Sequence, residues 1–347
     1  MRSQRLPISG KCLFSIERKF APIAVTVGPG TLSSFYPPPF AGGGLDQRGR
    51  IRHCQPFMPA SAHLTSGVLA AVLGAALLHA AWNSLVKSAE DKFLSSALVS
   101  LSSGAVAFTA AFVLPWPAPR ALPFIAASAL IHVLYFLLLG RLYRSADLSV
   151  AYPIMRGLAP LFAALIALAA IGEGPGPVTA AGVAILVAGV MLMGSSGLAH
   201  GRIDAAALTV AVGNSLVIAV YTVIDGEGAR VSGEGALFAF AYNSWADALR
   251  ALFYAPVVFA LRGRAAGAAL ARGWRLGLVG GIAAFLAYAV VVWAMTQAPI
   301  AAVAALRETS IVFAAVIGVA FLGEPFWTQR AAAALVVLAG IVALKLG

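Results

Sequence analysis

The sequence predicts an all-α integral membrane protein whose ten transmembrane helices form two inverted five-helix repeats. Apolar residues make up 61% of the 347 residues and charged residues only 11%, against about 45–50% and about 25% in soluble globular proteins. From residue 65 onward, apolar segments follow one another with short connections, and their length suits a bilayer core, which requires about 20 residues per helix. The second half of the chain also repeats the first. These features exclude a soluble enzyme, a disordered protein and a fibrous protein.

The expected spans are separated by connections that contain turn residues and charges. They cover residues 65–86, 93–115, 121–142, 148–171, 177–195, 204–225, 236–261, 274–296, 299–322 and 327–346.

An internal repeat relates the first five spans to the last five. When the sequence is shifted by 151 residues without gaps, Arg156 falls on Arg307 and Gly172-Glu173 falls on Gly323-Glu324. Small apolar matches are common in an Ala-rich chain, whereas an arginine and a Gly-Glu pair at the same spacing are not. Because five is odd, the second half must cross the membrane in the opposite sense. Secondary transporters have this architecture, with the substrate site near the midplane between the halves.

The first 57 residues differ from the rest. They contain seven Pro and seven Gly, and their eight Lys and Arg against two acidic residues account for +6 of the net charge of +11. Such a composition buries too little apolar surface to fold. We therefore expect 1–57 to be a disordered tail that arises by upstream mistranslation, with Met58 as the initiator. The first repeat then covers 58–200 and the second 201–347.

The basic residues outside the tail lie mostly between spans, where they orient helices rather than bind nucleic acid. Connections on one side hold ten of them and those on the other side three, so the positive-inside rule places both termini outside the cell. The ten are Lys87, Lys92, Arg141, Arg144, Arg202, Arg262, Arg264, Arg272, Arg275 and Arg330, and the three are Arg120, Arg230 and Lys345.

Nothing in the sequence predicts a cofactor or a metal. The two cysteines, Cys12 and Cys54, both lie in the tail, so the expected membrane part has no disulfide framework and no Cys-ligated metal. An HExxH zinc motif and a Walker-type phosphate loop are also lacking, which argues against a metalloprotease and an ATP-driven pump.

Three segments carry a family resemblance. They are His79-Ala80-Ala81-Trp82-Asn83 followed by Lys87, then Ala146-Asp147-Leu148-Ser149-Val150-Ala151-Tyr152-Pro153 through Gly172-Glu173, and Ala298-Pro299-Ile300-Ala301 through Arg307-Glu308-Thr309-Ser310 to Gly323-Glu324. Through them the chain resembles the EamA-type ten-helix carriers of the drug/metabolite transporter superfamily over residues 58–347.

The resemblance implies a multi-pass transporter of the cell (cytoplasmic or inner) membrane, often an exporter of amino acids or other small metabolites. It also implies a central cavity between the halves and termini in the cytoplasm, the opposite of the positive-inside assignment. Besides the lipid bilayer, we expect a small-molecule substrate and a proton as partners, and a monomer or weak homodimer.

Two repeat-related arginines are the main candidates for substrate binding. Arg156 and Arg307 lie at matching depth in spans four and nine, and arginine binds carboxylates and phosphates bidentately. Pro153 and Pro160 are expected to weaken the helix around Arg156. Alternatively, each arginine ties its helix to neighbouring carbonyl groups. Glu308, about 100° around the helix from Arg307, is the first candidate for proton coupling.

The other candidates are polar or aromatic residues inside the spans. Asp247 and Arg250 are three residues apart on span seven and can form an ion pair, which is either structural or functional. Further substrate-binding candidates are Tyr152, His79, Asn83, Tyr221, Tyr288 and Trp293, and further proton-coupling candidates are Asp225, at the end of span six, and His132. His132 shares a face with Tyr135. The aromatic residues, Tyr242 and Trp245 among them, can equally be packing residues or interface anchors.

The leading function is thus a secondary transporter that exports a small polar metabolite, such as an amino acid or related organic anion, by proton-coupled alternating access. One alternative is an uncoupled uniporter or exchanger. Another is an intramembrane serine hydrolase, because Gly194-Ser195-Ser196-Gly197 matches a Gly-x-Ser-Gly motif in which Ser196 would be the nucleophile and His132 the base. We expect Gly172-Glu173 and Gly323-Glu324 to be structural helix ends.

Overall fold

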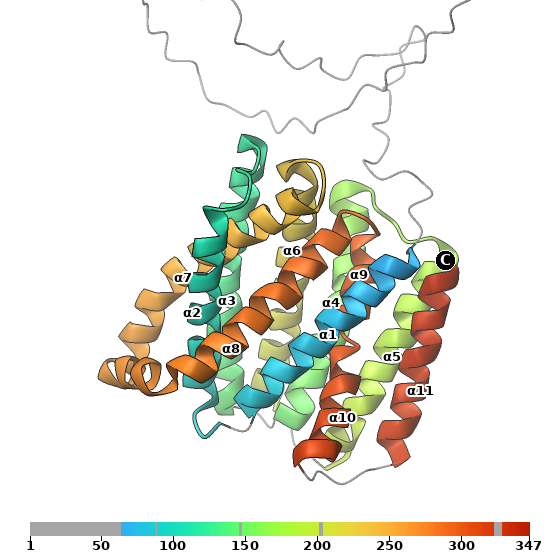
Figure 1. Cartoon of the computed structure of the whole chain (residues 1–347). Coiled ribbons are helices and arrows are strands. Elements are labelled where there is room, and N and C mark those ends of the chain that lie inside the picture. Colours follow the sequence, from blue (N-terminus) through green and yellow to red (C-terminus); the bar gives the residue numbers. More distant parts are fainter. Residues whose placement is uncertain (1–63, 88, 146–147, 201–203, 323–327) are drawn as a thin grey trace, which may run out of the picture. The chain divides into compact units, whose positions relative to one another are not determined.

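The computed structural model describes residues 64–87, 89–145, 148–200, 204–322 and 328–347 (Figure 1). The expected tail, Met58 and the Gly323-Glu324 pair lie outside these ranges. The helices of the first half are α1 (Ser66–Lys87), α2 (Lys92–Ala111), the 3₁₀ turn η1 (Pro119–Ala121), α3 (Leu122–Ser145), α4 (Leu148–Ile171) and α5 (Pro177–His200). Those of the second half are α6 (Ala205–Ser232), α7 (Ala236–Arg262), α8 (Arg264–Met295), α9 (Ile300–Arg307), α10 (Ser310–Leu322) and α11 (Thr328–Leu346).

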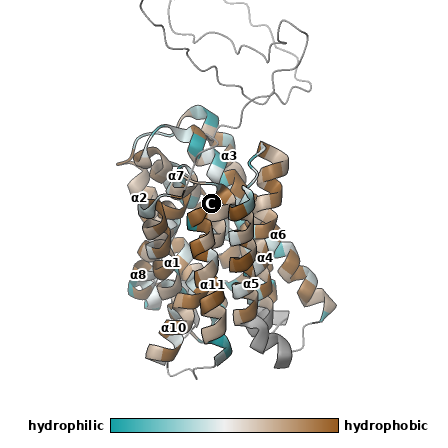
Figure 2. Cartoon of the chain, turned by 90° about the vertical axis from the view of Figure 1, so that its right-hand side faces the viewer, coloured by the Kyte–Doolittle hydropathy of each residue, from teal (hydrophilic) through white to brown (hydrophobic). Residues whose placement is uncertain are grey.

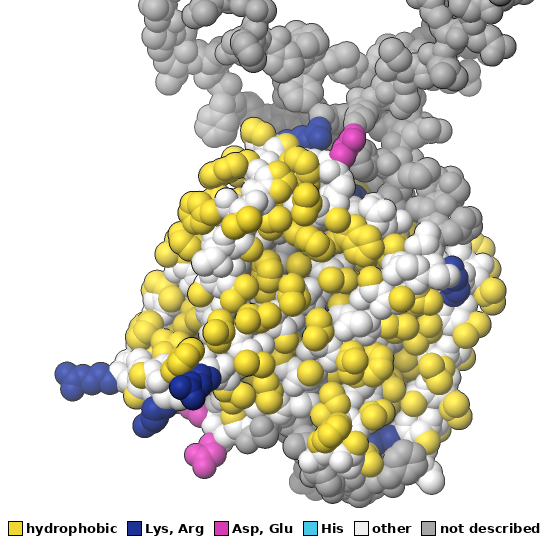
Figure 3. Space-filling model, in the orientation of Figure 1, with side chains coloured by type: hydrophobic (Ala, Val, Ile, Leu, Met, Phe, Trp, Pro, Cys, Tyr) yellow, Lys and Arg dark blue, Asp and Glu magenta, His cyan; other side chains and the backbone are white. Residues whose placement is uncertain are grey.

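The described residues form a multi-pass helical membrane protein. By length and composition, nine of their helical segments can cross a bilayer, with α9 and α10 counted as one, and Pro177–Met193 of α5 is a shorter apolar helix. Large apolar side chains such as Phe112, Phe321 and Leu346 are exposed, as expected where lipid is the solvent. Apolar residues dominate the helices in Figure 2 and cover the face seen in Figure 3, whereas charged side chains gather near its edges.

Two helices of the second half are longer than the sequence predicts. α8 begins at Arg264, so Gly263 alone separates it from α7. The φ angle of Gly263 is +51°, a conformation that glycine adopts without steric strain, and it permits a sharp reversal without a loop. α6 continues to Ser232. The prediction that Asp225 lies at the end of this helix is therefore wrong.

The ninth span is interrupted, which the sequence analysis did not anticipate. α9 ends at Arg307 and α10 begins at Ser310, with Glu308 and Thr309 between them. The amides of Glu308 and Thr309 donate to the carbonyls three residues earlier, and the Thr309 hydroxyl donates to the Leu306 carbonyl at 2.7 Å. This local tightening ends the helix at the carboxylate-bearing residue. By contrast, α4 stays helical through Pro153 and Pro160, although neither proline has an N–H to donate to the carbonyl four residues earlier.

Several helix pairs of the two halves pack in corresponding ways. α1 packs on α8 and α6 packs on α3, while α4 packs on α6, and α9 and α10 pack on α1. α2 packs on α8 and α3 packs on α7, and the pairs α2–α7 and α5–α11 also lie side by side.

The α5–α11 crossing requires glycine on both helices. A Cβ on Gly189 would lie 2.8 Å from the Val337 backbone nitrogen, and one on Gly340 would lie 2.7 Å from the Leu186 backbone nitrogen. These spacings are too short for any larger residue unless the helices separate, so the small residues allow the two backbones to touch, as in many membrane helix pairs.

Candidate substrate-binding site

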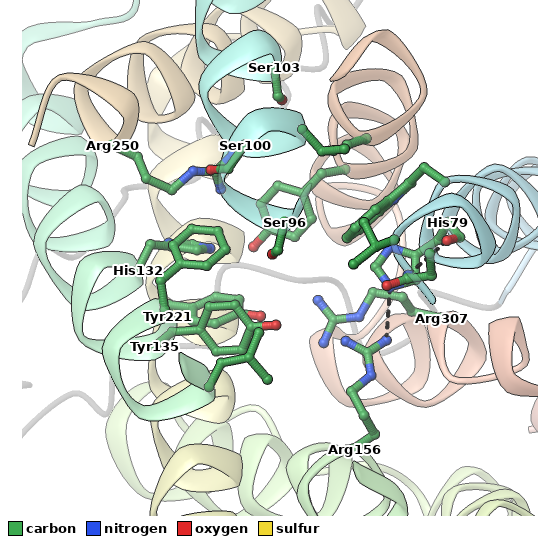
Figure 4. A pocket seen from close by; sticks show the side chains of 18 of the residues that line it. His79, Ser96, Ser100, Ser103, His132, Tyr135, Arg156, Tyr221, Arg250 and Arg307 are labelled. Atoms are coloured by element: carbon green, nitrogen blue, oxygen red, sulfur yellow. Dashed lines mark hydrogen bonds between the residues drawn. The ribbon is translucent and has the colours of Figure 1, made fainter. Parts of the chain in front are cut away.

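A cavity of about 100 Å³ lies among seven helices and the end of α9 (Figure 4). Its walls come from the C-terminal parts of α1 and α3 and the N-terminal parts of α2 and α4, so it occupies the end of the bundle where α1 joins α2 and α3 joins α4. The polar and aromatic side chains that line it are His79, Trp82, Asn83, Ser96, Ser100, Ser103, His132, Tyr135, Phe136, Tyr152, Arg156, Tyr221, Arg250, Tyr288 and Arg307.

The two repeat-related arginines meet at a single carboxylate. Arg156 Nε lies 2.8 Å from Glu308 Oε2 as an ion pair, although the geometry of these two atoms completes no hydrogen bond. Arg307 Nε donates to Glu308 Oε1 over 3.4 Å. Arg156, Arg307 and Glu308 are 3%, 4% and 1% exposed, and both arginines line the cavity while Glu308 does not. The cluster therefore buries two cations and one anion, with an excess charge of +1.

Glu308 contacts its chain neighbour Arg307, although neighbouring residues of a helix point about 100° apart. The backbone of Glu308 keeps helical dihedral angles, with φ −70° and ψ −12°. The contact is therefore made by the two long side chains, over 3.4 Å between Arg307 Nε and Glu308 Oε1.

His79 and Asn83 form the wall contributed by α1. His79 Nε2 lies 3.5 Å from Arg156 Nη2, the contact drawn in Figure 4, and Asn83 donates to the His79 carbonyl at 2.8 Å. Two further lining groups, the Trp82 indole N–H and the Ser100 hydroxyl, have no hydrogen-bond partner within the described part of the chain.

The predicted ion pair of span seven is confirmed. Arg250 Nη2 donates to Asp247 Oδ1, and the Ser103 hydroxyl of α2 donates to Asp247 Oδ2 at 2.5 Å. This pair joins α2 to α7, and Arg250 faces the cavity. Since its charge is already neutralised, it adds little to the excess positive charge around Glu308.

Asp225 is a buried carboxylate behind the cavity wall. It accepts hydrogen bonds from Tyr242 at 3.0 Å and from Tyr288. His132 Nδ1 lies 2.9 Å from the Ser128 carbonyl, to which it can only donate, and its ring stacks on Tyr221 at 3.9 Å between centroids. The structure thus brings the predicted aromatic residues of α3, α6 and α8 together on one wall.

Three of the predicted aromatic residues lie outside the cavity, and one of them, Tyr242, hydrogen-bonds to Asp225 instead. Trp293 packs in the apolar core and does not line the cavity, and Trp245 packs against Trp116 with ring centroids 4.7 Å apart. Both are packing residues here. The serines of α2 show the reverse, because Ser96, Ser100 and Ser103 line the cavity and were not predicted. A serine in an apolar span carries too weak a signal to be chosen from sequence.

A second charge cluster, built around the buried Arg230, lies at the other end of the bundle, and we call it the latch. It consists of Glu173, Glu227 and Arg230. Arg230 Nη1 lies 2.6 Å from Glu173 Oε2 and 2.7 Å from Glu227 Oε1. Its Nε and Nη2 donate to the carbonyls of Met295 at 2.9 Å and Ala298 at 3.4 Å. The latch therefore joins α6 to the end of α4 and to the α8–α9 connection.

The short helix α9 connects the latch with the cavity. At its start the Ile300 amide donates to Glu173 Oε1 at 2.6 Å, where a carboxylate is favoured by the partial positive charge of a helix N-terminus. At its other end lies Arg307. Every residue of α9 is buried, so the helix can move only with its neighbours.

The Gly172 helix stop is confirmed. Its φ is +70°, and its amide donates to the Leu168 carbonyl at 3.2 Å, which is the bond of a glycine cap in the left-handed conformation. The stop directs Glu173 away from α4 toward Arg230. Ser196 lies within the last turns of α5, and its side chain is outside the described residues.

Comparison with known proteins shows the fold alone. No family model and no curated protein matches the chain. A solved structure, titled "Crystal structure of protein", is similar with a TM-score of 0.62 and 19% sequence identity, over 83% of this chain and 98% of that one. It is among 29 chains of solved structures that match.

Proposed function

We propose that the protein is a secondary transporter for a small metabolite with an anionic group, such as an amino acid or related organic anion. The observation that supports this most is the pair of buried arginines on the cavity wall, which share one carboxylate. Intramembrane charges are rare and mark substrate or ion pathways. A guanidinium pair with an excess positive charge beside a hollow suits a carboxylate or phosphate.

We further propose that the chain is an EamA-type member of the drug/metabolite transporter superfamily, with ten spans in two inverted repeats. The helix packing supports the repeat, because exchanging each helix of one half with its counterpart maps α1–α8 onto α3–α6 and α2–α8 onto α3–α7. The glycine crossing obeys the same exchange. Leu186 and Gly189, shifted by 151 residues, become Val337 and Gly340. Gly189 faces Val337 and Gly340 faces Leu186, so the shift turns one of these contacts into the other.

The two ends of the bundle suit alternating access. The cavity lies at one end, and at the other the latch holds α4, α6 and the α8–α9 connection together. Opening of the latch would free the start of α9, whose other end contains Arg307. We propose that this helix transmits the change between substrate binding and opening of the far side.

The cavity end is assigned to the cytoplasm in this proposal. It is the end whose connections contain ten basic residues against three. Of those three, Arg230 is buried in the latch and Lys345 donates to the Leu64 carbonyl at 2.7 Å. By the positive-inside rule, this difference in the number of basic residues assigns the cavity end to the cytoplasm. Chain termini on the opposite side follow from this assignment, in contrast to what the family resemblance implies.

Proteoliposomes with an imposed pH gradient test the function. A metabolite screen that compares deletion and overexpression strains first selects the compound to load. Accumulation driven by the gradient supports the coupled transporter, and movement only down the compound's own gradient supports an uncoupled uniporter or exchanger. Product formation without transport would favour the hydrolase that uses Ser196.

Glu308→Gln separates binding from coupling in the same assay. We expect exchange between equal pools of substrate to survive, whereas uphill transport driven by the pH gradient is lost, because Gln does not exchange a proton. Glu234→Gln, at an exposed carboxylate of the α6–α7 connection, is the matched control and should transport normally. Unchanged uphill transport by Glu308→Gln would exclude Glu308 from coupling.

A further inference from the structure

Glu308 contacts the same two arginines that line the cavity, although it does not line the cavity itself. Its two oxygens face one guanidinium each, yet the contact with Arg156 completes no hydrogen bond and the one with Arg307 is long at 3.4 Å. Charge-assisted hydrogen bonds are normally about 2.7–2.9 Å long. The two arginines therefore hold a resident anion without using their full donor capacity, and they keep N–H groups on the cavity wall.

Protonation of Glu308 makes the net charge of this cluster more positive. Arginine stays charged, so the excess charge rises from +1 to +2 when the carboxylate becomes neutral. An anion that enters the cavity is then attracted more strongly. Linkage requires the reverse as well, since a bound anion must favour protonation of Glu308 by the same factor.

The other titratable groups around the cluster do not change this sign. Tyr152 of α4, Tyr221 of α6 and Tyr288 of α8 interact electrostatically with the arginines, and their phenols are neutral when protonated. The described side chains of α5, residues 177–193, include no titratable group. His79 of α1 lies beside Arg156, and a proton on it would also strengthen anion binding, so an experiment must separate it from Glu308.

We propose that the proton on Glu308 and the anionic group of the substrate bind together and cross the membrane in the same direction. This inference rests on the proposed anion site between Arg156 and Arg307, and it adds the sign of the coupling. An inward proton gradient would then drive uptake. Export against that gradient requires the opposite linkage, in which the proton expels the anion, and so the charge arrangement opposes the export that the family resemblance implies.

Binding of benzoate to the purified full-length protein tests whether the proton and the anion favour or oppose each other's binding. Benzoate is a monocarboxylate that stays ionised near neutral pH, and its ring suits the aromatic cavity wall, while benzamide is its neutral counterpart. We expect benzoate to bind about tenfold more tightly, or better, at about pH 6 than at about pH 8, with no such change for benzamide. Calorimetry in two buffers of different ionisation enthalpy should show net proton uptake as benzoate binds.

Variants assign the effect to Glu308. Glu308→Gln should bind benzoate tightly at both pH values without proton uptake, whereas the control Glu234→Gln should bind like the wild type. His79 lines the cavity, so His79→Gln is expected to lower the affinity at both pH values while the ratio between them stays as in the wild type. Weaker benzoate binding at low pH, proton release, or a pH dependence that persists in Glu308→Gln but is lost in His79→Gln would overturn the inference while leaving the anion site in place. No benzoate binding at either pH would overturn the anion site itself and the inference with it. If Glu308→Gln fails to fold, calorimetry on the wild type still gives the sign of the proton change, and proton uptake that persists in His79→Gln excludes His79 as its source.

Discussion

The cavity end and the latch end each pair buried arginine with carboxylate, but the arginines differ in the number and kind of groups that they contact. In the latch, one arginine contacts two carboxylates and two backbone carbonyls, and one of the carboxylates also caps a helix. At the cavity, two arginines share one carboxylate beside a hollow. Arg230 holds helices together because it also donates to two backbone carbonyls and does not line the cavity, whereas Arg156 and Arg307 line the cavity, where a ligand can reach them.

The largest expected effect is at the cavity end. Replacing Arg156 or Arg307 with Gln should weaken apparent substrate affinity by about ten- to a hundredfold, because a charge-assisted contact contributes about 1.5–3 kcal/mol. Lys should restore binding only in part, since a point charge does not reproduce the planar guanidinium. Concentration-dependent uptake into proteoliposomes measures this.

Arg262→Gln is the matched control for the arginine variants. Arg262 pairs with Asp91 at 3.3 Å, but both side chains are 40% exposed, and an exposed pair contributes about 0–1 kcal/mol. Its affinity should equal that of the wild type. If Arg156→Gln and Arg307→Gln reach the membrane normally and also bind like the wild type, the two arginines are structural.

Glu173→Gln tests the latch and should have an intermediate effect. It removes the charge that links α4 to Arg230 and to the start of α9, so the latch end should open more often, by about tenfold in population. Binding affinity at the cavity should change less than in the arginine variants. The same accessibility at the latch end as in the wild type would show that the cluster does not keep that end closed.

Thiol labelling measures that opening. Cys12 and Cys54 are the natural cysteines, and replacing both with Ser leaves a silent background. Ser232→Cys then reports on the latch end, where Ser232 is buried, and Ser96→Cys reports on the cavity. With Glu173→Gln added, labelling at position 232 by a polar thiol reagent should rise and labelling at position 96 should fall.

The smallest effect is expected from Glu227→Gln, which sharpens the comparison within the latch. Glu227 pairs with Arg230 from the same helix, three residues away, and is partly exposed. Such a pair contributes about 0.2–0.5 kcal/mol and joins no helices. Labelling at position 232 should therefore change by less than about twofold. An effect as large as that of Glu173→Gln would mean that total charge around Arg230, rather than the link between helices, keeps the latch closed.

Most helices and several site residues could be predicted from sequence. Length and apolarity locate a membrane helix because the bilayer imposes both, and the helix bounds agree within a few residues for α1, α4 and α11. His79, Tyr152, Arg156, Tyr221 and Arg307 were chosen because polar groups are costly in lipid, and all five line the cavity. The cavity serines and the latch were missed, because Arg230 reads as an ordinary loop charge and Glu173 as part of a helix end.

By itself, the sequence determined that this is a multi-pass helical membrane protein with a few buried charges, because composition and periodicity act through one helix at a time. Only the tertiary structure decided which charges meet. Arg156 and Glu308 are far apart in the chain, and they meet because α4 packs against α9. Glu173 and Arg230 come together in the same way, through a glycine stop that ends α4 beside α6. Such contacts follow from how helices cross, which no local pattern in the chain records.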